Sequence, residues 1–335
     1  MRPRGAMGNN PTVLILNAAS AFALAFAVLG LLMWRFGRFA LDRPNERSLH
    51  ERPVPRTGGV AVLTGGAVAL AFGAAPLWLP LVLAAALAAL SLADDLRGLP
   101  TALRLCAHLA AAALVAWYLL SPMHPFELAL LALGVAWITN LYNFMDGSDG
   151  LAGGMALIGF AAYAMAAGAA GDAPLAAASV ALAAAAAAFL LLNFPPARIF
   201  LGDVGSVPLG FLAAALGLAG WRDDVWPLWF PLLVFAPFIG DATLTLIRRF
   251  IRGERVWHAH REHYYQRLVR MGAGHRGAVL IGYGLMLVCA AAALYARTET
   301  PAVQAAVVVP AAVVLIAAAA WIDLRWSRHV RRAVG

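Results

Sequence analysis

Residues 126–170 read FELALLALGVAWITNLYNFMDGSDGLAGGMALIGFAAYAMAAGAA, which is two apolar runs separated by one short polar stretch. Each run holds roughly 20 residues, enough for a helix to cross a hydrocarbon core about 30 Å thick. Similar runs recur along the 335 residues, of which 62% are hydrophobic and only 13% are charged. The sequence therefore predicts an all-α, polytopic membrane protein built as a single domain over residues 1–335.

The apolar runs between polar breaks predict about eleven transmembrane helices. The first run is too long for the core of a signal peptide and lacks a convincing cleavage site, so we expect it to be a retained span. Alanine-rich stretches are interpreted as helix-packing surfaces. The predicted spans lie at 12–34, 58–75, 77–93, 101–120, 126–142, 151–170, 175–194, 204–221, 225–247, 276–296 and 302–324.

The distribution of arginine predicts how the helices are oriented in the membrane. All 25 basic residues are arginine, and the net charge is +8. Counting spans places 21 of the 25 on one side, which the positive-inside rule makes cytoplasmic, with a periplasmic N-terminus and a cytoplasmic C-terminus. This explanation of the basic charge gives no reason to expect nucleic-acid binding. The predicted cytoplasmic loops are 35–57, 94–100, 143–150, 195–203 and 248–275.

The polar stretch NLYNFMDGSDGL at 140–151 concentrates amides and carboxylates at the end of a span. Asn140, Asn143, Asp146 and Asp149 follow one another at intervals of three, so on a continuous helix they would drift round the axis. A glycine after each aspartate indicates that the helix ends here and the chain turns. The turn would let these side chains converge on one ligand. Capping of helix ends explains one or two of them but not all four.

Carboxylates also follow two other spans. Asp94 and Asp95 are adjacent in SLADDLRGLP. Their repulsion calls for a bound divalent cation or a proton-transfer role, unless this helix end simply reaches headgroup water. In NFPPARIFLGDVGS, Asn193 ends a span and Asp203 lies in a glycine-flanked turn. Asp203 is either a helix N-cap or a ligand of Mg²⁺, which prefers oxygen ligands.

Two basic segments are candidates for phosphate binding. Residues 42–62 place four arginines, including Arg56, before a Thr-Gly-Gly helix start whose exposed N–H groups would favour phosphate, although such loops are also usually basic. In HREHYYQRL, His260 and His263 would share one face of a helix, either as a phosphate-binding surface or as part of a membrane-surface helix without catalytic role.

Asp241, inside an apolar run, is either functional or an interhelical hydrogen-bond acceptor.

Together these stretches resemble the polyprenyl-phosphate N-acetylhexosamine-1-phosphate transferase family, glycosyltransferase family 4. The resemblance implies transfer of a sugar 1-phosphate from a UDP-N-acetylhexosamine to undecaprenyl phosphate, releasing UMP, with Mg²⁺ or alternatively Mn²⁺. It implies a bacterial inner-membrane enzyme with its active site facing the cytoplasm, and it is compatible with a homodimer. The matching stretches, in the family's order, are PNERSLHERPVPRTGG, ADDLRG, NLYNFMDGSDGLAGG, NFPPARIFLGDVGS, PFIGDATLTLIRR and HREHYYQRL.

The resemblance also implies roles for individual residues. Asp203 would bind Mg²⁺, and Asp94 would deprotonate or position the lipid phosphate with Asp95 beside it near the metal. The uridine-diphosphate portion would be held by Asn140, Asn143, Asp146 and Asp149. The sugar or diphosphate would contact His260, Arg261 and His263, and substrate binding would extend to Arg56 and Asn193.

The sequence departs from the family in HYYQ, which lacks the consecutive histidines of the muramoyl-pentapeptide translocase. It looks more like the O-antigen initiators of lipopolysaccharide synthesis, which take N-acetylated hexosamines or their 6-deoxy relatives. A CDP-alcohol phosphotransferase is the enzyme alternative, but its Asp-x-x-Asp-Gly-x-x-Ala-Arg motif would end here in Gly153–Gly154. A proton-coupled transporter is the non-enzymatic alternative, and it would need polar groups that reach both faces.

Overall fold

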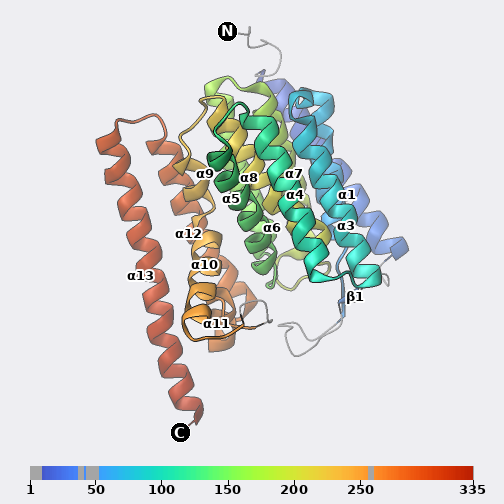
Figure 1. Ribbon diagram of the computed structural model, residues 1–335. Coiled ribbons are helices and arrows are strands. Elements are labelled where there is room, and N and C mark those ends of the chain that lie inside the picture. The colour runs from blue at the N-terminus through green and yellow to red at the C-terminus, as the bar shows by residue number, and fades with distance from the viewer. Residues whose placement is uncertain (1–9, 37–40, 43–52, 256–259, 335) are drawn as a thin grey trace.

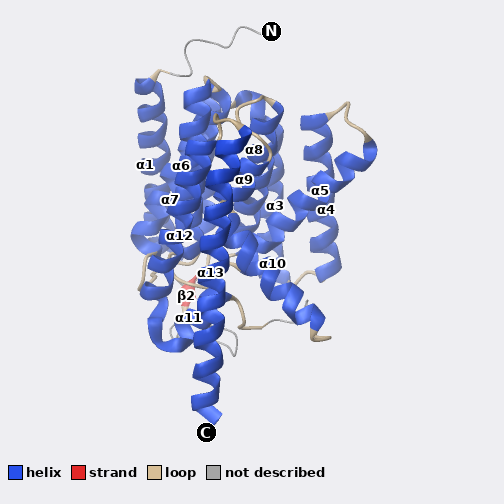
Figure 2. Cartoon of the chain, turned by 90° about the vertical axis from the view of Figure 1, so that its left-hand side faces the viewer, coloured by secondary structure: helices blue, strands red, loops and turns tan. Residues whose placement is uncertain are grey.

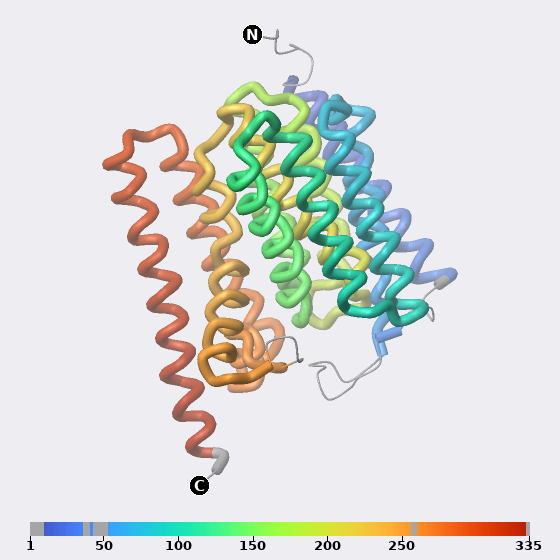
Figure 3. Tube along the Cα trace, in the orientation of Figure 1, coloured from blue at the N-terminus to red at the C-terminus, as the bar shows by residue number. Residues whose placement is uncertain are grey.

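The helices lie side by side with their long axes roughly along one direction (Figures 1 and 3). The structure is a computed structural model that describes residues 10–36, 41–42, 53–255 and 260–334. A two-residue antiparallel pair, β1 (Leu41–Asp42) with β2 (Val54–Pro55), precedes the second helix. The helices are α1 (Pro11–Phe36), α2 (Gly58–Ala67), η1 (Val68–Phe72), η2 (Ala75–Leu77), α3 (Trp78–Arg97), α4 (Thr101–Leu120), α5 (Pro125–Phe144), α6 (Leu151–Ala170), α7 (Ala173–Asn193), α8 (Asp203–Arg222), α9 (Trp229–Val234), α10 (Ala236–Ile251), α11 (Tyr264–Leu268), η3 (Val269–Ala273), α12 (Gly274–Ala296) and α13 (Pro301–Val334).

Within the described ranges, nine helical segments are long and apolar enough to cross a membrane. This confirms the predicted all-α, polytopic class, but two of the eleven expected spans are not continuous helices. The run at 58–75 forms α2 and the short helix η1, which ends at Phe72 before Gly73 in a left-handed conformation. The run at 225–247 is divided into α9 and α10, and Pro237 in the first turn of α10 cannot donate a backbone hydrogen bond.

Connections between the helices lie at the two opposite ends of the bundle. The β1–β2 pair, α11 and the C-terminal end of α13 lie at one end, whereas the α12–α13 connection lies at the other (Figures 1 and 2). Because consecutive long helices run in opposite directions, the α3–α4, α5–α6 and α7–α8 connections also share the end with α11. The described parts of the loops that were predicted to lie on one side of the membrane therefore lie at one end of the bundle. That this end is cytoplasmic stays a prediction of the positive-inside rule.

Helix α8 forms the centre of the bundle and α13 its periphery. The apolar window of α8 is 94% buried, compared with 11% for α13. Close contact at the centre depends on small residues, as is usual between membrane helices. A Cβ atom added to Gly59 of α2 would lie 2.2 Å from the Cα of Gly205 of α8, closer than any side chain can approach. The two backbones therefore touch at these glycines.

The Thr-Gly-Gly start of α2 does not present free N–H groups. The backbone N–H of Gly58 donates to the Phe200 carbonyl at 2.9 Å, and that of Gly59 donates to the Leu201 carbonyl at 2.9 Å. The prediction that these groups bind phosphate is therefore wrong, because the α7–α8 connection already satisfies them. The remaining arginines of that predicted anion site, apart from Arg56, lie outside the described residues.

We predict that Gly59→Ala lowers the free energy of unfolding by about 1–3 kcal/mol, because overpacking forces α2 and α8 apart. Gly30→Ala is the matched control, since a Cβ there meets nothing within 4 Å. In a helix interior that substitution should be neutral or stabilising by up to about 1 kcal/mol. Thermal unfolding in detergent measures both, and equal melting temperatures for the two variants would contradict the close contact.

Candidate active site

Four carboxylates from three separate parts of the chain gather at the end of the bundle where α11 lies. Arg104 of α4 connects two of them, because its Nη1 donates to Asp94 Oδ2 at 2.7 Å and lies 3.9 Å from Asp203 Oδ2. Arg56 lies 3.2 Å from a third, Asp95. These four carboxylates therefore outnumber the two arginines. We call this group the acidic basin: Asp94, Asp95, Asp146 and Asp203, with Arg56 and Arg104.

The two adjacent aspartates of the acidic basin have different environments. Asp94 uses both oxygens, accepting from the backbone N–H of Leu99 at 2.6 Å and from Arg104. Asp95 is paired with Arg56 through Oδ1, but its Oδ2 is buried with no hydrogen-bond partner among the described residues. Asp95 Oδ2 is therefore still able to accept a hydrogen bond, whereas Asp94 orients Arg104.

Asp203 is held at the start of α8, with its carboxylate facing the acidic basin. The N-cap of α8 is Gly202, at φ 71°, and Asp203 is the first helical residue, so the N-cap alternative for Asp203 is wrong. Asn143 hydrogen-bonds to the Asp203 carboxylate and also accepts from the Ser206 hydroxyl at 2.7 Å. The Asp203 side chain is 36% exposed, compared with 6% for Asp95. A ligand that arrives from solution would therefore meet Asp203 first.

The acidic basin has the electrostatic character of a cation site. Burial raises the pKa of Asp146 well above its usual range, and the neighbouring charge of Asp203 raises it further. Residues 10–36, 41–42, 53–255 and 260–334 contain no cluster of three Asp, Glu, His or Cys side chains able to enclose a metal. Mg²⁺ does not need such a cluster, because it usually binds one or two carboxylates and completes its shell with water and substrate phosphates. The residues present therefore fit Mg²⁺ together with a phosphate ligand.

Three other predicted substrate-binding residues instead hold the scaffold together. Asn193 is only 5% exposed; it accepts from the Gly150 N–H and donates to the Ile199 carbonyl, each at 2.9 Å. Asp149 accepts from the Ala197 N–H at 2.9 Å. Asn140 lies 3.1 Å from His108 of α4 and donates to the Ala136 carbonyl. Asn193 is buried and already bonded to two backbone groups, and its direct contact with substrate stays a prediction.

The segment with the two histidines is not the helix that its spacing predicts. Helix α11 begins only at Tyr264, so His260 and His263 precede it and do not share a helical face. His263 is instead the N-cap residue, and its Nδ1 lies 3.1 Å from Asp241 Oδ1. Asp241 also accepts the backbone N–H groups of Tyr264 and Tyr265, at 2.9 and 3.1 Å. Its role is therefore to hold the start of α11 against α10.

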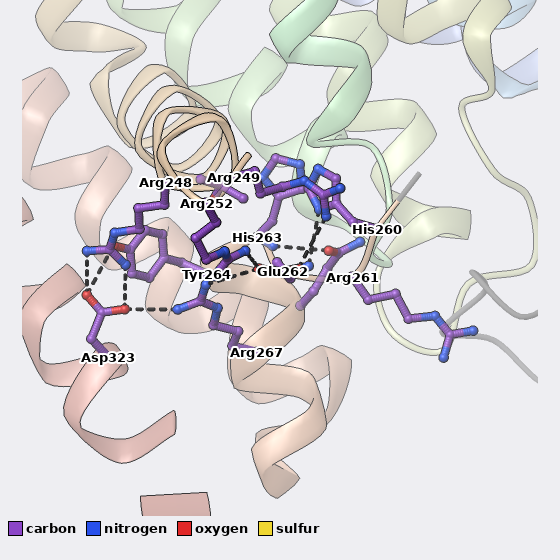
Figure 4. Close-up of polar contacts among 12 residues, drawn as sticks. Arg248, Arg249, Arg252, His260, Arg261, Glu262, His263, Tyr264, Arg267 and Asp323 are labelled. Carbon is purple, nitrogen blue, oxygen red and sulfur yellow. Dashed lines mark hydrogen bonds and ion pairs between the residues drawn. The ribbon is translucent and has the colours of Figure 1, made fainter. Parts of the chain in front are cut away.

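Helix α11 contacts the turn that carries Asp146. The Tyr265 hydroxyl donates to the Phe144 carbonyl at 3.2 Å, and a Cβ on Gly147 would lie 2.2 Å from that hydroxyl. His260 and Arg261 lie just before α11, and Figure 4 shows Arg261 extending away from the neighbouring arginines.

The neutral form of His260 is favoured. Burial, followed by the charges of His263 and Arg249, lowers the pKa of His260 to about 4. Its Nδ1 accepts from the Glu262 backbone N–H at 3.3 Å, so the proton of the neutral ring is on Nε2. The ring can therefore donate one hydrogen bond to a bound molecule.

Sequence reasoning missed two charged residues that organise these groups. Arg104 is an arginine inside a predicted span, and charge inside a span is itself a sign of function. Asp323 lies at the end of the last predicted span and pairs with Arg248 and Arg267. Its partners are more than 50 positions away, so local sequence gave no sign of the pairing.

Comparison with known proteins shows which family the chain is similar to. Residues 77–221 match the family model described as Glycosyl transferase family 4. The decaprenyl-phosphate N-acetylglucosaminephosphotransferase of Mycobacterium tuberculosis (strain ATCC 25618 / H37Rv) is 32% identical, with 89% of this chain and 86% of that protein covered. A probable undecaprenyl-phosphate N-acetylglucosaminyl 1-phosphate transferase of Bacillus subtilis is 29% identical over 78% of each chain, and the undecaprenyl-phosphate alpha-N-acetylglucosaminyl 1-phosphate transferase of Escherichia coli K12 is 26% identical over 72% of each.

The helical bundle is that of a multi-pass membrane protein, and the comparisons place it in a family of transferases. The chain belongs to the polyprenyl-phosphate hexosamine-1-phosphate transferase family. Its apolar helices and bacterial relatives make it a multi-pass bacterial membrane protein. The resemblance stated from the motifs alone is confirmed.

We predict that His260 titrates with a midpoint near its pKa of about 4 in the folded protein. Because this value is below the unfolded value of 6.5, the unfolded chain takes up a proton before the folded one. The contribution of His260 to stability is therefore present above pH 6.5 and is lost as the pH falls towards 4. NMR of the labelled ring checks the midpoint, and a value near 6.5 would show that the ring is not held as described.

Proposed function

We propose that the protein transfers an N-acetylhexosamine 1-phosphate from a UDP-sugar to a polyprenyl phosphate, releasing UMP, and that it requires Mg²⁺. The observation that carries this proposal is the acidic basin. There, at the end of the bundle where α11 lies, carboxylates outnumber arginines. A site with excess carboxylate suits a substrate that arrives as a complex of a divalent cation with a diphosphate. The three relatives named above, all polyprenyl-phosphate transferases, support the same reaction class.

The reaction fits direct attack by the lipid phosphate. One of its oxygens forms a bond to the phosphorus that carries the sugar, and the bond from that phosphorus to the oxygen shared with UMP breaks. UMP leaves with the bonding electrons. Arg104 and Arg56 reduce the repulsion between the two anionic phosphates, and their own positions are fixed by Asp94 and Asp95. Catalysis by position and charge is typical of phosphoryl transfer.

Mg²⁺, or alternatively Mn²⁺, would be held by Asp203, with Asp146 beside it. When bound, the ion supplies charge neutralisation at the diphosphate. Asn143 orients the Asp203 carboxylate towards it.

An apolar cavity of about 420 Å³ adjoins α11 and supports a lipid acceptor. Its walls come from α10, α12 and α13, and Asp241, Tyr264 and Tyr265 lie at its polar end. Hydrocarbon is the occupant that such walls favour, because a polar group placed against them would find few hydrogen-bond partners. A polyprenyl chain that enters here would bring its phosphate close to the end of the bundle where the acidic basin lies.

The donor sugar is assigned less directly. His260 and Arg261 lie beside α11, where a neutral imidazole N–H and a guanidinium suit the sugar and its phosphate. The names of the relatives favour N-acetylglucosamine, and a 6-deoxy N-acetylhexosamine for O-antigen synthesis is the alternative. We place the site on the cytoplasmic side of the inner membrane, in agreement with the arginine distribution.

The deciding experiment incubates the purified full-length protein with undecaprenyl or decaprenyl phosphate, Mg²⁺ and a panel of UDP-N-acetylhexosamines. We expect UMP release with one donor, and none when either the acceptor or Mg²⁺ is left out. UMP release without acceptor would contradict direct attack. No release with any N-acetylhexosamine donor would reject the proposed function.

Asp203→Asn should lower kcat by about 10²–10³-fold, because a neutral amide binds Mg²⁺ poorly and stabilises the transferring phosphoryl group less. Asp223→Asn is a matched control at the opposite end of the same helix, where the side chain is 34% exposed and pairs with Arg222. It should leave kcat unchanged. Loss of activity in the Asp223 variant would instead favour a pathway that reaches both faces, as in a transporter. Initial rates at several Mg²⁺ concentrations make the comparison.

A further inference from the structure

We infer that Asp323 on α13 is a positioning residue, which fixes α11, and with it His260 and Arg261, beside the acidic basin. Its expected effect on catalysis rests on the proposed function, whereas its effect on α11 does not. Asp323 is far from the acidic basin in sequence, and it belongs to the most exposed of the candidate spans. A charged carboxylate in such a helix costs free energy unless it pairs with other groups or serves a function.

Asp323 accepts hydrogen bonds from three side chains. Arg248 of α10 approaches it in a two-pronged geometry, with Nη1 at 2.6 Å from Oδ1 and Nη2 at 2.7 Å from Oδ2. Arg267 of α11 donates to Oδ1 at 2.9 Å, and the Tyr264 hydroxyl donates to Oδ2 at 3.3 Å. Figure 4 shows this convergence of α10, α11 and α13 on one carboxylate.

The charges around α11 make this carboxylate necessary. Arg267 is only 5% exposed, so its charge needs a partner within the protein. The other nearby acid, Glu262, already pairs with Arg249 at 3.2 Å and with Arg252, and it lies 3.9 Å from Arg267. Without Asp323, Arg248 and Arg267 would therefore lose the anion that they share and would repel each other.

The effect reaches the acidic basin through α11 itself. The guanidinium groups of Arg248 and Arg267 lie over the Tyr264 ring, at 5.3 and 5.4 Å from its centre. The next residue, Tyr265, is fastened by its backbone N–H to Asp241 and by its hydroxyl to the Phe144 carbonyl. The five-residue helix is thus held on one side by α13 and on the other by the turn that leads to Asp146. Loosening the first contact frees the segment that begins at His260.

The test compares Asp323→Asn with Arg325→Gln in the full-length protein. Both variants remove one charge from α13. The guanidinium carbon of Arg325 lies 4.6 Å from the centre of the Trp321 ring on the same helix, so this side chain does not connect α13 to α11 through that contact. We expect Asp323→Asn to raise KM for the UDP-sugar at least fivefold. Asp323→Glu should recover most of this loss, and Arg325→Gln should match the wild type.

Hydrogen–deuterium exchange of the Tyr264 and Tyr265 amides gives a measurement that does not depend on activity. We expect at least tenfold faster exchange in Asp323→Asn than in Arg325→Gln. Unchanged exchange would overturn the proposal, and so would a lower melting temperature with an unchanged KM for the donor. If the wild-type protein releases no UMP from any donor, the proposed function fails, and the exchange rates alone decide whether Asp323 positions α11.

Discussion

Three backbone hydrogen bonds between residues 55–59 and 200–201 are the constraint on which the rest of the site depends. The Pro55 carbonyl accepts from Phe200, and the N–H groups of Gly58 and Gly59 donate back to Phe200 and Leu201. These bonds join the start of α2 to the start of α8, and the Gly59–Gly205 contact permits the close approach. Arg56 and Asp203 come to one place because their backbones are paired, so the electrostatics of the acidic basin follow from a packing requirement.

Charge is divided unequally between the two polar regions at this end of the bundle. The acidic basin holds more carboxylates than arginines, whereas the surroundings of α11 hold four arginines close to Glu262 and Asp323. A magnesium-bound diphosphate has both characters, because the ion is attracted to carboxylates and the phosphate oxygens to guanidinium groups. The arrangement thus suits a ligand that bridges the regions, with the turn at residues 144–150 between them.

The sequence alone predicted the class, most spans and the four carboxylates of the acidic basin, because carboxylates at the ends of apolar runs are rare and conspicuous. It missed Arg104, which joins two of these carboxylates. It could not show that the Asn193 amide is bonded to the Gly150 N–H and the Ile199 carbonyl, because both contacts depend on the fold. Helical spacing also misled at His260, because α11 starts four residues later. The pairing of Asp323 with Arg248 depends on tertiary contact, which no local pattern contains.

The position of Asp323 on the last helix has a consequence for biogenesis. Chains emerge from the ribosome in order, and early segments can fold before later ones exist. All residues of the acidic basin precede α10, so they can assemble while Arg248 and Arg267 still await their shared carboxylate. The contacts that hold α11 against α13 would then form only when this last helix is in place.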